Sequence, residues 1–150
     1  MTPTQTFVEE KLQQLLKRTK SDLTAIGVLD LATRKLRWYS VFGSISNRTQ
    51  RIRQQINLGL TGEVIRTGSF LQSQATKHEI FELGESIMLT EKLLHAAVWP
   101  ITLDKHQING AILIGKRYEG NYDAQQVEAG AKVVHELSNY YVQHISSKNF

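Results

Sequence analysis

The sequence predicts an α+β fold, in which a central antiparallel sheet carries the terminal helices on one face. Both ends of the chain have apolar residues that recur at helical spacing. Between them lie two pairs of apolar, β-branched runs, each pair joined by a short polar turn, which is the pattern of β-hairpins. An irregular stretch from Gly43 to Leu93 separates the hairpins, and we expect its loops and short helices to cover the other face of the sheet.

A single domain accounts for the 150 residues, 41% of them hydrophobic. We expect an N-terminal helix over about residues 4–20, a core over about 22–118 and a C-terminal helix over about 123–145. Thr4 or Thr2 caps the first helix in this interpretation, and Asp123 caps the last.

The first hairpin joins a strand over residues 23–31 to a second over 36–42. Strand alternation places Leu36, Trp38, Ser40 and Phe42 on one face of that second strand, and Arg37, Tyr39 and Val41 on the other. A buried tryptophan needs a partner for its indole N–H. Trp38 is therefore either a core residue with a backbone partner or a pocket wall with a ligand partner.

The remaining elements are shorter or less regular up to the second hairpin. We expect a short helix or irregular stretch at 48–55, strands at 56–58 and 70–72, helices at 60–66 and within 80–94, and hairpin strands at 95–103 and 108–115. Pro100 cannot donate to a ladder, so it should mark an edge, a bulge or a break in pairing.

Composition excludes several classes of function. Without cysteine there is no disulfide, no thiolate metal site and no cysteine nucleophile. The five histidines have no metal-ligand spacing, and no nucleotide-binding or nucleophile motif is present, so we expect binding rather than catalysis, with no metal and no cofactor. No apolar run could span a bilayer and the first residues do not resemble a signal peptide, so we expect a cytoplasmic protein without membrane contact.

The net charge of +4 and the pI near 9.4 raise the possibility of nucleic-acid binding. The densest basic cluster is Arg48, Arg51 and Arg53, and no aromatic residues interleave with it to stack on bases. We therefore interpret this cluster as a solvated basic face and expect no nucleic-acid partner.

The glycine-rich stretch from Gly59 to Gly68 reads GLTGEVIRTG. Gly59 and Gly62 permit positive φ or a close approach of the backbone. A helix that begins here presents amide N–H groups without intrahelical partners, and these suit a small anion. The same spacing is also common punctuation before a helix, so a purely structural role stays open.

Four segments in this order resemble the GAF domain family: GVLDLATRKLRWYSVFG, NLGLTGEVIRTGSFL, HAAVWPITLDKHQINGAILIG and YDAQQVEAGAKVV. The resemblance covers roughly residues 23–142. It implies a sheet of about six antiparallel strands with the terminal helices on one face and a ligand pocket on the other. Within the family, the chain is most similar to the stand-alone nitrate receptors of bacterial nitrate/oxygen control systems.

That resemblance implies a receptor that binds nitrate and modulates a partner sensor histidine kinase. Nitrate accepts hydrogen bonds and donates none, so backbone amides and an indole N–H can hold it between apolar walls. The contacts that we expect on this basis are Trp38, Ile52, Leu60, Thr61, Gly62, Trp99, Pro100 and Ile101.

Three other functions are alternatives to the nitrate receptor. Methionine sulfoxide reductases of this family need cysteines, which the chain lacks. A sensor of another small ligand and a ligand-free interaction module stay open. The two terminal helices carry long apolar stripes that the sheet is not expected to cover completely, so we also expect a homodimer or a kinase contact through them.

Overall fold

The computed structural model describes residues 2–74, 85–104, 107–118 and 120–145. In chain order the elements are α1 (Pro3–Thr19), β1 (Leu23–Asp30), β2 (Lys35–Phe42), the 3-10 turn η1 (Thr49–Arg51), β3 (Arg53–Gln55), α2 (Gly59–Thr67), β4 (Leu71–Gln74), α4 (Ser86–Thr90), β5 (His95–Asp104), β6 (Gln107–Lys116) and α5 (Ala124–His144).

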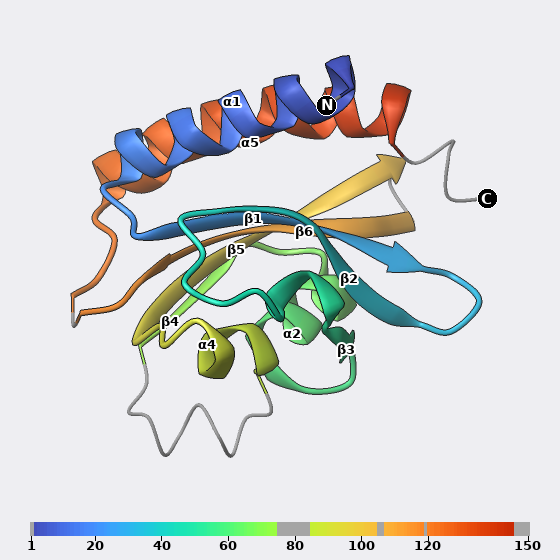
Figure 1. Cartoon of the computed structure of the whole chain (residues 1–150), viewed down its shortest axis with the longest axis horizontal. Helices are drawn as coiled ribbons and strands as arrows, with labels where there is room; N and C mark the ends of the chain where they lie inside the picture. Colours follow the sequence, from blue (N-terminus) through green and yellow to red (C-terminus); the bar gives the residue numbers. More distant parts are fainter. Residues whose placement is uncertain (1, 75–84, 105–106, 119, 146–150) are drawn as a thin grey trace.

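Six described strands form one antiparallel sheet in the order β3-β2-β1-β6-β5-β4. Helices α1 and α5 lie side by side across one face of the sheet, while α2 and α4 lie against the other (Figure 1). The predicted fold class and its layering are therefore confirmed.

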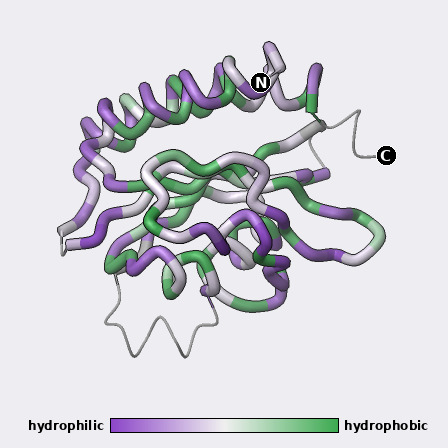
Figure 2. Tube along the Cα trace, viewed as in Figure 1, coloured by the Kyte–Doolittle hydropathy of each residue, from purple (hydrophilic) through white to green (hydrophobic). Residues whose placement is uncertain are grey.

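The sheet separates two hydrophobic clusters. The cluster under α1 and α5 includes Val8, Leu12, Ile112 and Leu137, and the cluster on the α2 side includes Trp38, Leu60, Val64 and Leu113. Figure 2 shows apolar residues along the central strands and alternating polar and apolar residues along the terminal helices. The strands β1, β2, β5 and β6 thus contribute to both clusters through their alternating side chains.

Both terminal helices begin with a capping box in which a glutamine reaches back to the cap. The Gln5 amide donates to Thr2 Oγ1 at 3.1 Å, and the Gln126 amide donates to Asp123 Oδ1 at 2.8 Å. The structure thus selects Thr2 over Thr4. The two helical stripes are covered only in part within the single chain. Buried stripe residues are Val8, Leu12, Leu15, Val134, Tyr141 and Ile145, and half-buried ones are Phe7, Leu16, Val127 and Ala131.

The predicted face assignment along β2 holds for its first half only. Leu36 and Trp38 lie on the α2 side as expected, but Val41 also packs there and Phe42 packs on the helix side. The register against β1 shifts at this point, with Ile26 opposite Ser40 and Gly27 opposite Trp38. The extra residue, Tyr39, forms a bulge that exchanges the two faces of the strand.

The predicted strand at 56–58 is wrong. The strand β3 lies three residues earlier, where Gln54 pairs with Leu36 of β2, within a stretch expected to be helical or irregular. Ile56 to Leu58 lead from this edge strand into α2. The other short strand is confirmed as β4, and the helix expected within 80–94 is confirmed as α4, although residues 80–84 lie outside the described part.

Pro100 stands where the sheet has an open edge. In β5 it is paired with Ala111 of β6, whereas the described pairs between β4 and β5 end at Val98. Proline has no N–H to donate, and here its nitrogen needs no partner on the β4 side. Of the three predicted alternatives, an edge, a bulge or a break in pairing, the described pairs show a break in the pairing of β5 with β4 before Pro100.

Candidate functional site

Helix α2 begins without a side-chain cap of its own. Leu58 occupies the N-cap position, which usually holds a serine, threonine, asparagine or aspartate, and it makes no capping hydrogen bond. Gly59 follows with φ +76°, a conformation that glycine adopts without strain. The first amides of α2 are therefore left for a partner from elsewhere in the chain or from a ligand.

That partner is the carboxylate of Glu85, a fully buried residue immediately before α4. The Thr61 amide donates to Glu85 Oε2 at 3.1 Å, and the Thr61 hydroxyl donates to Oε1 at 2.9 Å. Gln54 Nε2, from β3, donates to Oε1 at 2.8 Å. We call this set of donors, provided by Gln54, Thr61 and the start of α2, the α2 cradle.

The α2 cradle is shaped for an oxygen atom. A Cβ built on Gly59 would lie 2.3 Å from Glu85 Oε2, so any side chain larger than hydrogen would collide with the carboxylate. Burial raises the pKa of Glu85, and hydrogen bonds from Gln54 and Thr61 oppose this shift by stabilising the charged form. The arrangement supplies donors and a helix N-terminus to an anion that water does not reach.

Trp38 lies on the same side of the sheet and carries an unused donor. Its side chain is fully buried, and Nε1 has no hydrogen-bond partner within the described structure. Trp38 follows Leu36 by two residues on the same face of β2, and Leu36 is paired with Gln54 of the cradle. The indole therefore belongs to the wall of the sheet that faces the cradle, in diagonal relation to Gln54.

The structure brings together some of the eight predicted contacts and separates others. Trp38, Leu60 and Thr61 are buried on the α2 side, Ile52 packs there partly exposed, and the ring of Pro100 is on that side by strand alternation. Gly62 serves the packing of α2, because a Cβ there would lie 2.4 Å from the Ile56 carbonyl oxygen.

Trp99 and Ile101 are the two that the structure places elsewhere. Both belong to the cluster under the terminal helices, on the opposite face of the sheet. Trp99 packs on Phe70 with ring centroids 4.8 Å apart and lies against Gly130 of α5. A pocket enclosed by all eight residues is therefore not formed, because residues 99 and 101 alternate with Pro100 along β5.

Sequence reasoning missed Glu85, the residue that fills the site. It precedes α4 within residues 80–94, where the sequence predicts only a helix, and 24 positions separate it from Thr61. No spacing rule links an isolated glutamate to a helix that far away. The only available signal is the leucine at the N-cap position of α2, which shows that the helix start lacks a local partner.

A second buried carboxylate, Glu91, provides a contrast. It accepts from the Ile45 amide at 2.8 Å and from Arg117 Nη2 at 2.9 Å, and also from the hydroxyls of Ser44 and Thr49. Its charge is thus neutralised by an arginine. Within the described residues Glu85 has no such cation, and only neutral donors and the α2 N-terminus face it.

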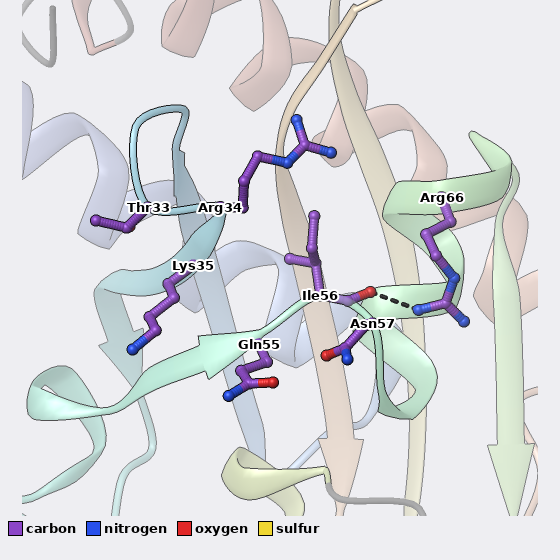
Figure 3. A pocket seen from close by; sticks show the side chains of 7 residues that line it. All are labelled: Thr33, Arg34, Lys35, Gln55, Ile56, Asn57 and Arg66. Atoms are coloured by element: carbon purple, nitrogen blue, oxygen red, sulfur yellow. Dashed lines mark hydrogen bonds between the residues drawn. The ribbon is translucent and has the colours of Figure 1, made fainter.

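The open cavities lie at another part of the molecule, around the β1–β2 turn and the end of α2. The largest of three, about 480 Å³, is lined by Thr33, Arg34, Lys35, Gln55, Ile56, Asn57 and Arg66 (Figure 3). A neighbouring cavity of about 390 Å³ shares Arg34, Ile56 and Arg66 with it. A third, of about 210 Å³, shares Thr33 and Lys35 and adds Arg37 and Arg53. None of the eight predicted contacts lines these three cavities, which together form a basic groove.

No group of three or more metal-ligating side chains occurs within the described ranges. In the same ranges, no helix has the length and apolar character needed to cross a membrane.

The fold is similar to that of known GAF structures. A nitrate-site mutant of NreA from Staphylococcus aureus is 24% identical, with a TM-score of 0.66 over 79% of this chain and 88% of that one. The GAF domain of a phosphoenolpyruvate-protein phosphotransferase from Coxiella burnetii is 14% identical, with a TM-score of 0.79 over 99% of this chain and 89% of that one. No protein-family model and no curated protein matches the sequence. At these identities the similarity shows a GAF-like fold.

Proposed function

We propose that this GAF-like chain is a small-anion sensor, that nitrate is its ligand, and that it acts on a partner sensor histidine kinase. The observation that carries the proposal is the α2 cradle, where an uncapped helix start and two side chains hold a planar carboxylate away from water. An anion site of this kind needs no buried lysine or arginine.

Nitrate resembles a carboxylate in the features that the cradle uses. Both are planar anions that present two oxygens side by side, and both accept hydrogen bonds without donating any. The carboxylate of Glu85 thus stands in for two of the three nitrate oxygens. A trigonal anion carries one oxygen more, and we assign that oxygen to Nε1 of Trp38, a buried donor without a partner among the described residues.

The comparisons support nitrate as the ligand to test first. One of the similar structures is described as NreA mutated in its nitrate-binding site. We assign the direct contacts to Trp38, Leu60 and Thr61, and the apolar walls to Ile52 and Pro100. Trp99 and Ile101 are left out of this assignment because they pack under the terminal helices.

Calorimetry on the wild type and on Trp38→Phe tests the ligand and the role of the indole together. We expect nitrate, but not chloride, to give saturable heat with the wild type. The variant keeps the apolar ring and loses one donor to a charged ligand, which should weaken binding by about 1.5–3 kcal/mol, or about one to two decades. Absence of nitrate heat in the wild type would refute the function, whereas equal affinities would refute only the contact from Trp38.

A ligand-free interaction module is the second candidate, and one specific observation favours it. Glu85 already satisfies the Thr61 amide and hydroxyl, so the cradle is complete without an external anion. In that case the chain would bind its partner equally well with and without nitrate.

The proposed partner and a homodimer through α1 and α5 are tested separately from the ligand. A pull-down of sensor kinases with and without nitrate tests the first, and light scattering tests the second. A strict monomer that captures no kinase would contradict both.

A further inference from the structure

The α2 cradle and the Glu85 side chain fit each other on two independent counts. The hydrogen bonds that Gln54 and Thr61 give the carboxylate come from neutral donors that converge on its two oxygens. The absence of a Cβ at Gly59 makes room for Oε2, and the φ of +76° there brings the backbone close. The start of α2 therefore fits the carboxyl group of Glu85 closely.

We propose that Glu85 is an internal ligand of the α2 cradle, and that an external anion binds there only by replacing it. This inference rests on the proposed function, in which the external anion is nitrate. It makes Glu85 a specificity-determining residue, because the affinity for each anion is set by competition with a carboxylate that is part of the chain.

Glu85 and an external anion compete because the α2 cradle has too few donor hydrogens for both. The Thr61 amide and hydroxyl have one hydrogen each, and both are used by Glu85. Two anions in one buried site would also repel each other strongly. A ligand therefore cannot add to the occupied cradle, and it has to exchange with the carboxylate.

If ligands bind by replacing Glu85, their affinity should depend on the number of acceptor oxygens that they carry. An anion with only two acceptor oxygens would make the bonds that Glu85 already makes and would gain nothing by replacing it. A planar anion with a third oxygen can also accept from Trp38 Nε1, which has no partner within the described residues. Because an unpaired buried donor is costly, this extra bond favours trigonal anions over carboxylates in the intact chain.

The test uses Glu85→Ala, which empties the cradle, and Glu63→Gln as a matched control. The control removes one negative charge from an exposed side chain of the same helix. Thermal unfolding of the wild type and both variants is followed in nitrate, acetate and chloride at equal ionic strength. Calorimetry then gives the nitrate affinity of each protein.

We expect nitrate and acetate to raise the melting temperature of Glu85→Ala by at least about 2 °C over chloride, and acetate to leave the wild type unchanged. If the carboxylate fills the cradle in about 90% of molecules, its removal should strengthen nitrate binding about tenfold. The control should bind nitrate like the wild type.

The outcomes separate this inference from the proposed function. Stabilisation of Glu85→Ala by acetate alone would support the internal ligand and refute nitrate as the ligand. Equal nitrate affinity in the wild type and Glu85→Ala would overturn the internal ligand and leave the function standing. No response of a folded Glu85→Ala to either anion would overturn the cradle itself. If that variant does not fold, Glu85→Gln, which keeps the volume and removes the charge, should show the same gain in nitrate affinity, and no gain would overturn the inference.

Discussion

At the residue scale, buried ionisable side chains make the stability of this domain depend on pH. His95 is a clear case besides Glu85. Its Nε2 lies 2.9 Å from Gln72 Oε1, which also accepts from the Tyr122 amide, so Nε2 carries the proton. Nδ1 is buried and has no partner among the described residues. Burial together with the nearby charge of Lys116 lowers the pKa of His95 to about 4. The ring is therefore neutral in the native protein at pH 7.

This neutral histidine predicts a loss of stability in mild acid. The unfolded chain takes up the proton near pH 6.5 and the native chain only near pH 4, so stability falls as the pH drops through this interval. Between pH 7.5 and pH 5 the free energy of unfolding should fall by about 2 kcal/mol from this residue. Urea unfolding at both pH values measures this fall in the free energy of unfolding, and His95→Gln should lack the part due to His95. An equal fall in the wild type and the variant would contradict the assignment of the pH dependence to His95.

Glu85 acts on stability with the opposite sign. Its pKa is raised by burial, so the native chain releases this proton at higher pH than the unfolded chain does. Its contribution therefore decreases as the pH rises above about 4.5. The comparison of wild type with His95→Gln cancels this contribution, because Glu85 is present in both proteins.

At the scale of elements, the parts predicted from sequence are those with local signals. Helices α1 and α5 have long apolar periodicity and capping residues, and the β1–β2 and β5–β6 hairpins have alternating apolar runs with polar turns. The faces of β2 beyond Trp38 were not predictable, because the bulge at Tyr39 depends on how β2 pairs with β1. β3 was missed for a similar reason, since its three residues form a strand only through pairing with Lys35 to Arg37.

In the candidate site, too, features with a local sequence signal could be predicted, and features that depend on tertiary contacts could not. The helix start at Gly59 and its suitability for an anion could be predicted from the glycines alone. The position of Glu85 at this helix start could not be predicted, because it depends on a tertiary contact between residues 24 positions apart in the sequence. Trp38 of β2 and Trp99 of β5 were expected to share the pocket before it was known how β1 and β6 connect these two strands, and in the sheet the two side chains lie on opposite faces.

At the scale of the whole molecule, the positive charge gathers in the basic groove. Arg34, Lys35, Arg37, Arg53 and Arg66 line its three cavities, and the only acidic residue there is Asp30, whose Oδ1 accepts from the Ala32 amide. The apolar side chains of Ile56 and Ile65 also line these cavities, and the described lining residues include no aromatic ring that could stack on bases.

We therefore expect no nucleic-acid complex at physiological salt. Fluorescence anisotropy with labelled duplex and single-stranded DNA should show at most weak binding in dilute buffer. This binding should weaken steeply as salt is added, because the release of phosphate counterions becomes less favourable. Arg34→Glu should weaken such binding more than Arg48→Glu, which lies outside the groove. A tight complex at physiological salt would contradict the interpretation of this surface.

The central claim is that the start of α2 is an anion site, and residue-resolved amide shifts test it most directly. Nitrate is titrated into ¹⁵N-labelled wild type and Glu85→Ala, with chloride as the control at equal ionic strength. We predict saturable shifts at the backbone amides of Leu60 and Thr61 and at Nε1–H of Trp38, with half-saturation at lower nitrate in the variant. Shifts confined to Arg34, Lys35 and their neighbours in the basic groove, or no saturable shift at Thr61 in either protein, would contradict the claim.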